Sequence, residues 1–311
     1  MNDQTARDGS PPTTEHLSVP ADQYDATWIE QTWGWDTPEE FVATQGANLR
    51  PRIVEALDLA QIEPGMRVLD IGCGRGEVVL ECARRGIHAL GVDYSSTVID
   101  LANKTLSTLP EEVQQRATFA CGELQKLELD GPYDRIFMLD FVEHLYDWQL
   151  DEVFRACHEI LAEDGALVIH TLPNRWLYEI TYRRLVRLAM PWLPANPRSE
   201  KEMSIHVNEM TITHLHKLLE TNGYHPQVWL KDMTVEQAAW HHNQPLNDRR
   251  HRLYRWLTNP LVGGFVKAVS KTPFKLLTVN DIFAVASKRA MSLPMRVPSR
   301  RTEQLMIRLA A

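Results

Sequence analysis

Three side chains that can bind a metal ion or carry a proton lie close together at Asp140, Glu143 and His144. They follow the apolar segment 134–139, which is typical of a buried strand. If a helical turn begins there, positions i, i+3 and i+4 share one face, so the three side chains would converge. Two carboxylates and an imidazole suit Mg²⁺, Mn²⁺ or Fe²⁺ better than structural zinc. The alternative is that Glu143 caps a helix and His144 packs or acts as a base.

A further histidine, His206, lies downstream in the sequence SIHVNE. An imidazole titrates near neutral pH, so His144 or His206 could also serve as the general base of a reaction. The alternative for His206 is a loop histidine that is hydrogen-bonded to backbone. We predict His144 and His206 as catalytic residues, and Asp140, Glu143 and His144 as candidate metal ligands.

A second group of residues indicates a nucleoside-binding site. The segment VLDIGCGRGE, residues 68–77, is an apolar run that ends in Asp70 and continues into three alternating glycines. Glycines let a backbone turn tightly and approach a ligand closely. Asp93 ends the next apolar segment, about 20 residues after Gly72, which is the spacing at which an acid binds a ribose diol.

The glycine spacing favours a ligand that lacks a pyrophosphate. A dinucleotide fingerprint requires G-x-G-x-x-G, whereas this segment reads G-x-G-x-G and has Glu77 where the last glycine would stand. A carboxylate at that position opposes a pyrophosphate but tolerates a ligand such as S-adenosylmethionine. A nicotinamide-dependent oxidoreductase is therefore the weaker alternative.

The elements that position these residues alternate between strand and helix, which predicts a parallel sheet with helices on both faces. We expect strands at 67–71, 88–93, 117–121, 134–139 and 166–171, and helices at 76–85, 96–108 and 148–161. A helix at 211–222 leads to a strand at 226–231, and a strand at 281–287 would close the sheet. Ligands in such a sheet bind beyond the carboxyl ends of the strands.

The order of these motifs resembles that of the class I S-adenosylmethionine-dependent methyltransferases, over roughly 53–231. Residues 68–77 resemble their first motif, and GVDYS (91–95) their second-strand motif. CGEL (121–124) is similar to their adenine segment, and 133–140 and 161–169 to their fourth and fifth strands. The resemblance implies an α/β fold with a Rossmann-like, doubly wound, mainly parallel seven-stranded sheet and helical insertions. It also implies S-adenosyl-L-methionine as the cofactor.

The resemblance assigns cofactor-binding roles to the matching residues. It implies that the backbone at Gly72 and Gly74 approaches the methionine part and that Asp70 binds near its amino group. Asp93 would accept hydrogen bonds from both ribose hydroxyls, and Tyr94 would lie against the adenine. Further cofactor contacts are implied for Glu123, where the family often has Asp at the adenine amino group, and for Asp140.

The pattern acid-x-x-Glu-His at 140–144 resembles that of metal-dependent quinone O-methyltransferases and small-RNA 2′-O-methyltransferases. In the latter a further histidine completes the site, and His206 lies at a comparable distance. The segment TLPNR (171–175) is similar to one in small-molecule O-methyltransferases. Asn174 would either bind the acceptor or form an Asx turn that opens the next segment.

Composition restricts the partners and the compartment. A formal net charge of −8 argues against a nucleic-acid binder, whose footprint would be basic. The four cysteines show no metal-finger spacing and suit a reducing compartment. No segment resembles a signal peptide or is long enough to span a bilayer. We expect a cytoplasmic protein that is at most peripheral at the membrane.

We expect a disordered tail at 1–23, a helical lid at 24–62, a methyltransferase domain at 63–289 and a second tail at 290–311. The domain would carry cap insertions at about 175–203 and 235–279. Within them, 175–201 and 240–277 interleave basic and aromatic residues, which favours contact with membrane headgroups. The alternative is a cap over the active site with a solvated basic face.

The sequence thus predicts an S-adenosylmethionine-dependent methyltransferase that methylates an oxygen of a small or lipid-linked acceptor, with a divalent cation such as Mg²⁺ as a candidate second cofactor. The alternatives are methylation of a sugar or another polar metabolite, and the nicotinamide-dependent oxidoreductase. The sequence specifies neither the acceptor nor the oligomeric state.

Overall fold

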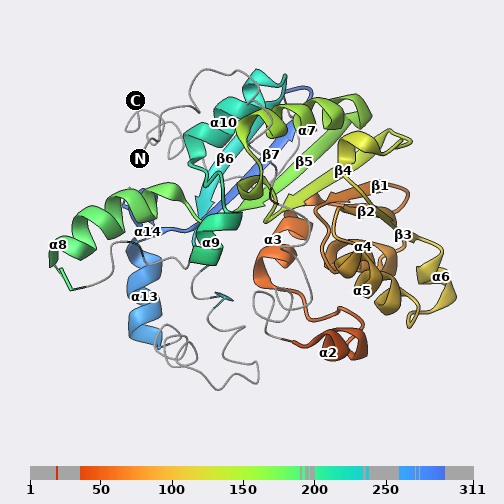
Figure 1. Ribbon diagram of the computed structural model, residues 1–311, viewed down its shortest axis with the longest axis horizontal. Helices are drawn as coiled ribbons and strands as arrows, with labels where there is room; N and C mark the ends of the chain where they lie inside the picture. The colour runs from red at the N-terminus through yellow and green to blue at the C-terminus, as the bar shows by residue number, and fades with distance from the viewer. Residues whose placement is uncertain are drawn as a thin grey trace.

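A seven-stranded sheet forms the centre of the protein, with strand order β3-β2-β1-β4-β5-β7-β6 (Figure 1). The computed structural model describes residue 19 and residues 36–189, 191–192, 196, 200–233, 236–237, 259–269, 271–272 and 274–290. The strands are β1 Arg67–Ile71, β2 His88–Asp93, β3 Ala117–Cys121, β4 Tyr133–Leu139, β5 Leu161–Thr171, β6 His225–Lys231 and β7 Asp281–Ser287. Strands β1 to β5 pair with one another in parallel, so the predicted mainly parallel seven-stranded sheet is confirmed.

We expected the last strand, β7, to close the sheet. It instead lies between β5 and β6 and runs antiparallel to both. All seven residues of β7 are buried, whereas β6 begins with exposed and half-buried positions. A strand whose two faces are both covered by helices belongs in the interior of a sheet, and its sequence is a continuous apolar run. The run IFAVA at 282–286 therefore explains the interior position of β7, and β6 becomes the edge.

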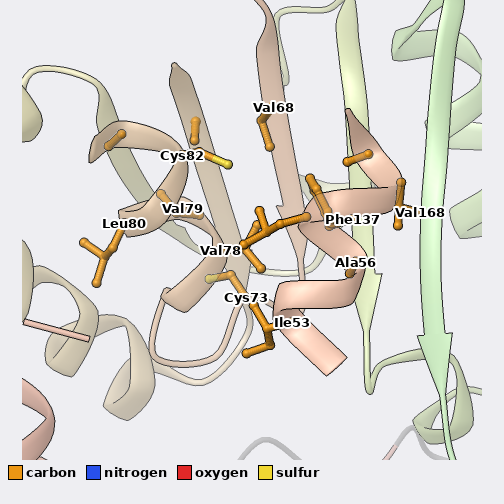
Figure 2. Packing of buried hydrophobic residues seen from close by; sticks show 14 of the residues in the cluster. Ile53, Ala56, Val68, Cys73, Val78, Val79, Leu80, Cys82, Phe137 and Val168 are labelled. Atoms are coloured by element: carbon orange, nitrogen blue, oxygen red, sulfur yellow. The ribbon is translucent and has the colours of Figure 1, made fainter. Parts of the chain in front are cut away.

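Two groups of helices cover the two faces of the sheet (Figure 1). One core cluster joins α3 Pro51–Ala60, α4 Glu77–Arg84 and α5 Ser96–Leu106 to one face, and part of it is shown in Figure 2. The other joins α7 Asp147–Ile160 and α10 Ile212–Thr221 to the opposite face. Neighbouring strand residues alternate between the clusters: Val68 belongs to the first and Leu69 to the second. This two-sided burial fixes the strand register and so the positions of the strand ends.

Part of the expected N-terminal lid is described. Helix α2 Pro38–Ala43 begins at a capping box formed by Thr37 and Glu40, and α3 follows after a short loop. Helix α6 Glu111–Gln114 and the one-turn helix η2 Leu124–Lys126 lie before and after β3. The expected tails 1–23 and 290–311, apart from residues 19 and 290, lie outside the described residues, as do the lid residues 24–35 with Trp28, Trp33 and Trp35.

Both expected insertions contribute described helices. The π-helix η4 Leu177–Val186, α8 Arg187–Ala189 and α9 Glu200–Ile205 lie between β5 and α10. Helices α13 Pro260–Val269 and α14 Lys275–Thr278 lie between β6 and β7, and α14 packs against η4 (Figure 1). Residues 238–258 of the second insertion are outside the described part. Among the helices that the structure describes, none has the length and apolar character needed to cross a bilayer.

Candidate active site

The glycine segment forms a tight turn between β1 and α4. Gly72, Gly74 and Gly76 have φ values of 70°, 52° and 88°, a region that glycine adopts without steric cost. The backbone N–H groups of Gly72 and Cys73 both donate to the carbonyl oxygen of Val92, which ties the turn to β2. A Cβ atom on Gly72 would lie 2.5 Å from a ring carbon of Phe141. This position therefore requires glycine both for its backbone conformation and for its space.

Asp93 links the second strand to this turn. Its two carboxylate oxygens accept hydrogen bonds from the backbone N–H groups of Gly74, at 3.0 Å, and Ser95, at 2.9 Å. Burial raises the pKa of Asp93, and these hydrogen bonds oppose that effect. Each carboxylate oxygen has two acceptor sites, so the ribose role predicted for Asp93 is compatible with its role in the turn.

Asp70 lies at the end of β1 and is almost completely buried. Burial, followed by the negative charges of Glu77 and Asp93, raises its pKa well above the usual range. A cationic ligand group close to this carboxyl would stabilise its ionised form. This is the environment in which the predicted contact with the cofactor's amino group would be favourable.

The two residues predicted to contact the adenine differ in exposure. Tyr94 is half-buried beside the first core cluster, and its hydroxyl donates to the carbonyl oxygen of Val19 at 3.4 Å. Glu123 follows β3 with an exposed side chain that pairs with Lys126 at 2.7 Å. Their adenine contacts remain predictions.

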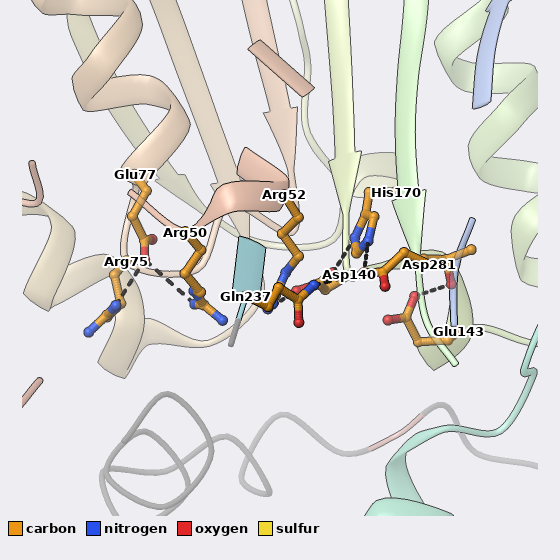
Figure 3. Close-up of polar contacts among 10 residues, drawn as sticks. Arg50, Arg52, Arg75, Glu77, Asp140, Glu143, His170, Gln237 and Asp281 are labelled. Atoms are coloured by element: carbon orange, nitrogen blue, oxygen red, sulfur yellow. Dashed lines mark hydrogen bonds and ion pairs between the residues drawn. The ribbon is translucent and has the colours of Figure 1, made fainter. Parts of the chain in front are cut away.

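Glu77 occupies the place of the third dinucleotide glycine, and arginines neutralise it (Figure 3). Its Oε1 atom lies 2.9 Å from the guanidinium of Arg75 and 3.6 Å from that of Arg50. Burial alone would raise the pKa of Glu77, but the two arginines outweigh burial and lower it. Arg75 also pairs with Asp36 at 2.7 Å and lies over the ring of Phe41. The carboxylate therefore fastens the N-terminal helices to the glycine turn.

A second cluster lies just past β4. The short 3₁₀ helix η3 Val142–His144 carries Glu143 and His144, and the segment after α9 brings His206 to them. One ligand atom from each of Glu143, His144 and His206 lies within 4.8 Å of the other two. The two histidine rings meet edge to face, with centroids 5.0 Å apart. Residues 61 positions apart in sequence thus meet, because His144 Nδ1 bonds the carbonyl oxygen of Ile205 at 3.0 Å.

The protonation states in this cluster are set by burial. Burial, and then the charge of Asp140, raises the pKa of Glu143 to about 8, against a hydrogen bond donated by Thr171 at 2.7 Å. Burial, and then His206, lowers the pKa of His144 to about 4. Because a carbonyl oxygen only accepts, Nδ1 of His144 carries the hydrogen and Nε2 carries the lone pair. His144 is therefore a neutral imidazole at neutral pH, as a metal ligand or a proton acceptor must be, but its lowered pKa makes it a weak base.

Asp140 does not join this cluster, which corrects the predicted convergence of Asp140, Glu143 and His144. Its Oδ1 atom lies 2.6 Å from Nδ1 of His170, and its Oδ2 atom lies 2.5 Å from the guanidinium of Arg52 (Figure 3). The helical turn begins only at Val142, and Asp140 precedes it in a left-handed conformation with φ of 54°. The i, i+3, i+4 rule therefore does not apply to Asp140.

Four residues in this region were missed by the sequence analysis: Arg52, His170, Asp281 and Gln237. His170 lies between Asp140 and Asp281, and Gln237 donates to Asp281 at 2.9 Å. Burial alone would lower the pKa of His170, but the two carboxylates outweigh it and raise it to about 9. For His170 and Asp281 the sequence signal is a polar residue inside or at the start of an apolar strand, which does not identify its partner; Arg52 and Gln237 lie outside the strands and lack even this signal.

Asn174 takes the Asx-turn alternative. Its Oδ1 atom accepts a hydrogen bond from the backbone of Trp176 at 3.2 Å, and its side-chain nitrogen donates to the carbonyl oxygens of Leu276 and Val279. The side chain is completely buried. It therefore joins the start of the first insertion to the end of the second.

A parallel sheet whose strand ends carry a glycine turn, a second-strand acid and a histidine cluster defines a nucleoside-binding enzyme of the Rossmann-like type. A family model described as a methyltransferase domain matches residues 43–227. The chain belongs to this family and is an S-adenosylmethionine-dependent methyltransferase. This assignment removes the support for a nicotinamide-dependent oxidoreductase.

Two groups of curated relatives match. The ubiquinone biosynthesis O-methyltransferase of Caulobacter sp. is 29% identical over 194 residues, which cover 59% of this chain and 75% of that protein. Cyclopropane mycolic acid synthase 2 of Mycobacterium leprae is 31% identical over 126 residues, 38% of this chain and 40% of that protein. The chain thus spans less than half the length of the second relative.

Solved structures share the fold. The [4+2]-cyclase SpnF superposes with a TM-score of 0.55 at 16% identity, covering 88% of this chain and 99% of that one. Phosphoethanolamine N-methyltransferase 2 of Haemonchus contortus, with S-adenosylhomocysteine bound, gives 0.56 at 18% identity, covering 85% and 60%. At these identities the likeness shows the fold alone.

Proposed function

We propose that this enzyme transfers the methyl group of S-adenosylmethionine to an oxygen of a small or lipid-linked acceptor. The observation that carries the proposal is the cluster of Glu143, His144 and His206 beside the strand ends. The ubiquinone biosynthesis O-methyltransferases among the relatives support an oxygen acceptor.

The reaction breaks the bond between the methyl carbon and the sulfonium sulfur and forms a carbon–oxygen bond in line with it. Sulfur keeps the electron pair, and S-adenosylhomocysteine is released. The acceptor hydroxyl must lose its proton, and Nε2 of His144 carries the lone pair that can accept it. The main work of the protein is to hold the acceptor oxygen in line with the methyl group, since alignment supplies much of the rate.

The residues also fit a divalent cation. Glu143, His144 and His206 offer one oxygen and two nitrogen donors, a set that suits Fe²⁺ better than Mg²⁺, which prefers oxygen ligands. A cation bound there would lower the pKa of the acceptor hydroxyl and orient it. Asp140 would stay outside this set, because Arg52 and His170 occupy its two oxygens. Dialysis against EDTA tests this: unchanged activity with acceptor would leave His144 as the base without a metal.

The lipid-linked acceptor and peripheral membrane contact are supported by the two insertions. The four most exposed large apolar side chains of the described residues all lie there: Leu188, Trp192, Leu261 and Phe274, exposed by 83%, 76%, 85% and 67%. Exposed Arg183, Arg184 and Lys271 lie in the same insertions and complement anionic headgroups. We expect the protein to co-sediment with anionic vesicles but not with zwitterionic vesicles. Failure to bind either kind of vesicle would remove the proposed membrane role.

The acceptor class is tested by methyl transfer from radiolabelled S-adenosylmethionine into a cell extract, followed by partition between organic solvent and water. Label in the organic phase is expected for a lipid or quinone acceptor. Label in the aqueous phase would favour a sugar or another polar metabolite, and the insertions would then act as a cap. Label in neither phase would contradict the proposed activity toward small acceptors.

A further inference from the structure

His170 is a completely buried histidine on β5 whose two ring nitrogens both face carboxylates (Figure 3). Nδ1 lies 2.6 Å from Oδ1 of Asp140 at the end of β4, and Nε2 lies 3.1 Å from Oδ1 of Asp281 at the start of β7. The ring also packs against Phe283, the neighbouring residue on β7, with centroids 4.7 Å apart. Three adjacent strands therefore meet at this one side chain.

Hydrogen-bond chemistry fixes the role of each partner. An ionised carboxylate can only accept hydrogen bonds, so an imidazole between two carboxylates donates from both nitrogens. With Arg52, the row reads cation, anion, cation, anion: Arg52, Asp140, His170 and Asp281. Buried charges are tolerated when each is paired in this way, and removing one member leaves its neighbour uncompensated.

His170 holds Asp140 by its backbone as well as by its side chain. The carbonyl oxygen of His170 accepts from the backbone N–H of Asp140 at 3.0 Å, where Asp140 has a left-handed φ of 54°. Such a conformation costs free energy in a residue other than glycine, so the surrounding contacts must maintain it. The remaining oxygen of Asp140 binds Arg52 near the start of α3, which places this guanidinium at the strand ends.

We propose that His170 is a positioning residue of the cofactor site: it fixes Asp140 at the end of β4 and, through Asp140, fixes Arg52 of the N-terminal helix beside the site. The inference rests on S-adenosylmethionine binding at these strand ends. Because His170 is completely buried, it acts through Asp140 and Arg52. A variant that keeps a hydrogen-bond donor in place of Nδ1 of His170, which faces Asp140, should therefore keep its cofactor affinity. A variant that keeps only a donor in place of Nε2, which faces Asp281, should lose affinity.

Two substitutions separate the nitrogens. The amide nitrogen of an asparagine at this position replaces Nδ1 and can donate to Asp140, while that of a glutamine replaces Nε2 and can donate to Asp281. We expect His170→Asn to bind S-adenosylhomocysteine within about threefold of the unsubstituted enzyme, and His170→Gln to bind it at least about tenfold more weakly. Isothermal titration calorimetry without acceptor measures both, so the result does not depend on the acceptor's identity.

The coupling between the Arg52 and His170 substitutions provides a second measurement. If His170 had a purely structural role, their effects on cofactor affinity would simply add. Adding Arg52→Gln to His170→Gln should cost little further affinity, whereas adding it to His170→Asn should cost as much as it does alone. Equal affinity losses in the two His170 variants, or additive losses with Arg52→Gln, would overturn the proposal. If the unsubstituted enzyme bound no S-adenosylhomocysteine, the cofactor assignment itself would fail.

A second pair of variants covers the case in which the His170 variants do not fold. Arg52→Gln and Asp281→Asn alter the two ends of the row, whose ion pairs run through Asp140 and His170, while the charge of Asp281 also acts directly on Arg52. The proposal predicts that their effects on cofactor affinity are coupled, so that the double variant loses less than the product of the single losses. Independent effects would overturn it.

Discussion

The turn after β1 and the segment after β4 both lie at the carboxyl ends of the parallel strands, but different kinds of contact hold them in place. The backbone of the glycine turn is held by backbone groups of β2 and by Asp93, which is 19 residues from Gly74, although Arg75 and Glu77 also pair with Asp36 and Arg50. After β4, they are made by side chains that are distant in sequence, such as His170 with Asp281, 111 residues apart. The first region is therefore a local structure, and the second is assembled by the completed sheet.

The comparison extends to the two acids near the end of β4. Burial acts on both Asp140 and Glu143, yet the pKa of Asp140 lies below its usual range while that of Glu143 is raised to about 8. Arg52 and His170 compensate Asp140, whereas Glu143 receives a hydrogen bond from Thr171 and the repulsion of Asp140. Asp140 is therefore a fixed anion, whereas Glu143, only three residues further on, is a neutral acid or a candidate metal ligand.

The largest effect is expected from a substitution in the local region. Gly72→Ala places a Cβ atom 2.5 Å from Phe141 at a φ of 70°, so the turn must shift. We expect S-adenosylhomocysteine affinity to fall about 100-fold, measured by calorimetry. Gly65→Ala is the matched control, because Gly65 also has a positive φ, of 93°, but no atom within 4 Å of the added Cβ. Equal losses in the two variants would show that backbone strain, not close approach, matters.

Asp93→Ala should have the next largest effect. It removes the acceptor predicted for the ribose and the carboxylate that accepts from the backbone N–H groups of Gly74, in the turn, and Ser95, after β2. We expect cofactor affinity to fall by at least about tenfold, with Asp93→Asn intermediate because it keeps one acceptor oxygen. Unchanged affinity in Asp93→Ala would remove Asp93 from the cofactor site.

In the second region, Glu143 should make stability depend on pH. Its pKa in the folded protein is about 8, above the ordinary value of 4.5, so the folded state holds this proton more tightly than the unfolded state. The resulting stability is fully present below pH 4.5 and is lost as the pH rises through about 8. Glu143→Gln should therefore flatten the decline in unfolding free energy between pH 6.5 and 8, measured by urea denaturation. An unchanged slope would show that Glu143 is ionised throughout.

The smallest effect is expected at the exposed end of the cofactor region. Lys126 pairs with Glu123, but their side chains are 71% and 53% exposed. Exposed ion pairs contribute between about 0 and 1 kcal/mol, so Lys126→Ala should leave the melting temperature almost unchanged. Glu123→Ala, measured alongside it, should weaken S-adenosylhomocysteine binding by only a few-fold, about 1 kcal/mol or less. A larger loss would show that the predicted adenine contact of Glu123 contributes more to binding than an exposed hydrogen bond does.

The contrast between local and distant contacts also explains what the sequence could predict. Apolar runs, glycines and acids at strand ends specify β1, β2 and the turn after β1, whose boundaries match the predicted ones, whereas β5 begins at Leu161 and not at the predicted residue 166. The continuous apolar run of β7 is typical of an interior strand, but the sequence pattern does not encode which strands become its neighbours, nor the partners of Asp140 that follow from this. His206 could be proposed only from the resemblance, and Arg52 and His170 not at all, because their partners are set by the sheet.

The account is tested most directly by measuring cofactor binding and methyl transfer together in His144→Asn. The asparagine amide can still donate to the carbonyl oxygen of Ile205, which His144 Nδ1 bonds at 3.0 Å, but it removes Nε2. The account predicts unchanged S-adenosylhomocysteine affinity and a methyl-transfer rate about 100-fold lower than that of the unsubstituted enzyme. Transfer at the unsubstituted rate with normal binding would contradict the placement of the reaction at Glu143, His144 and His206.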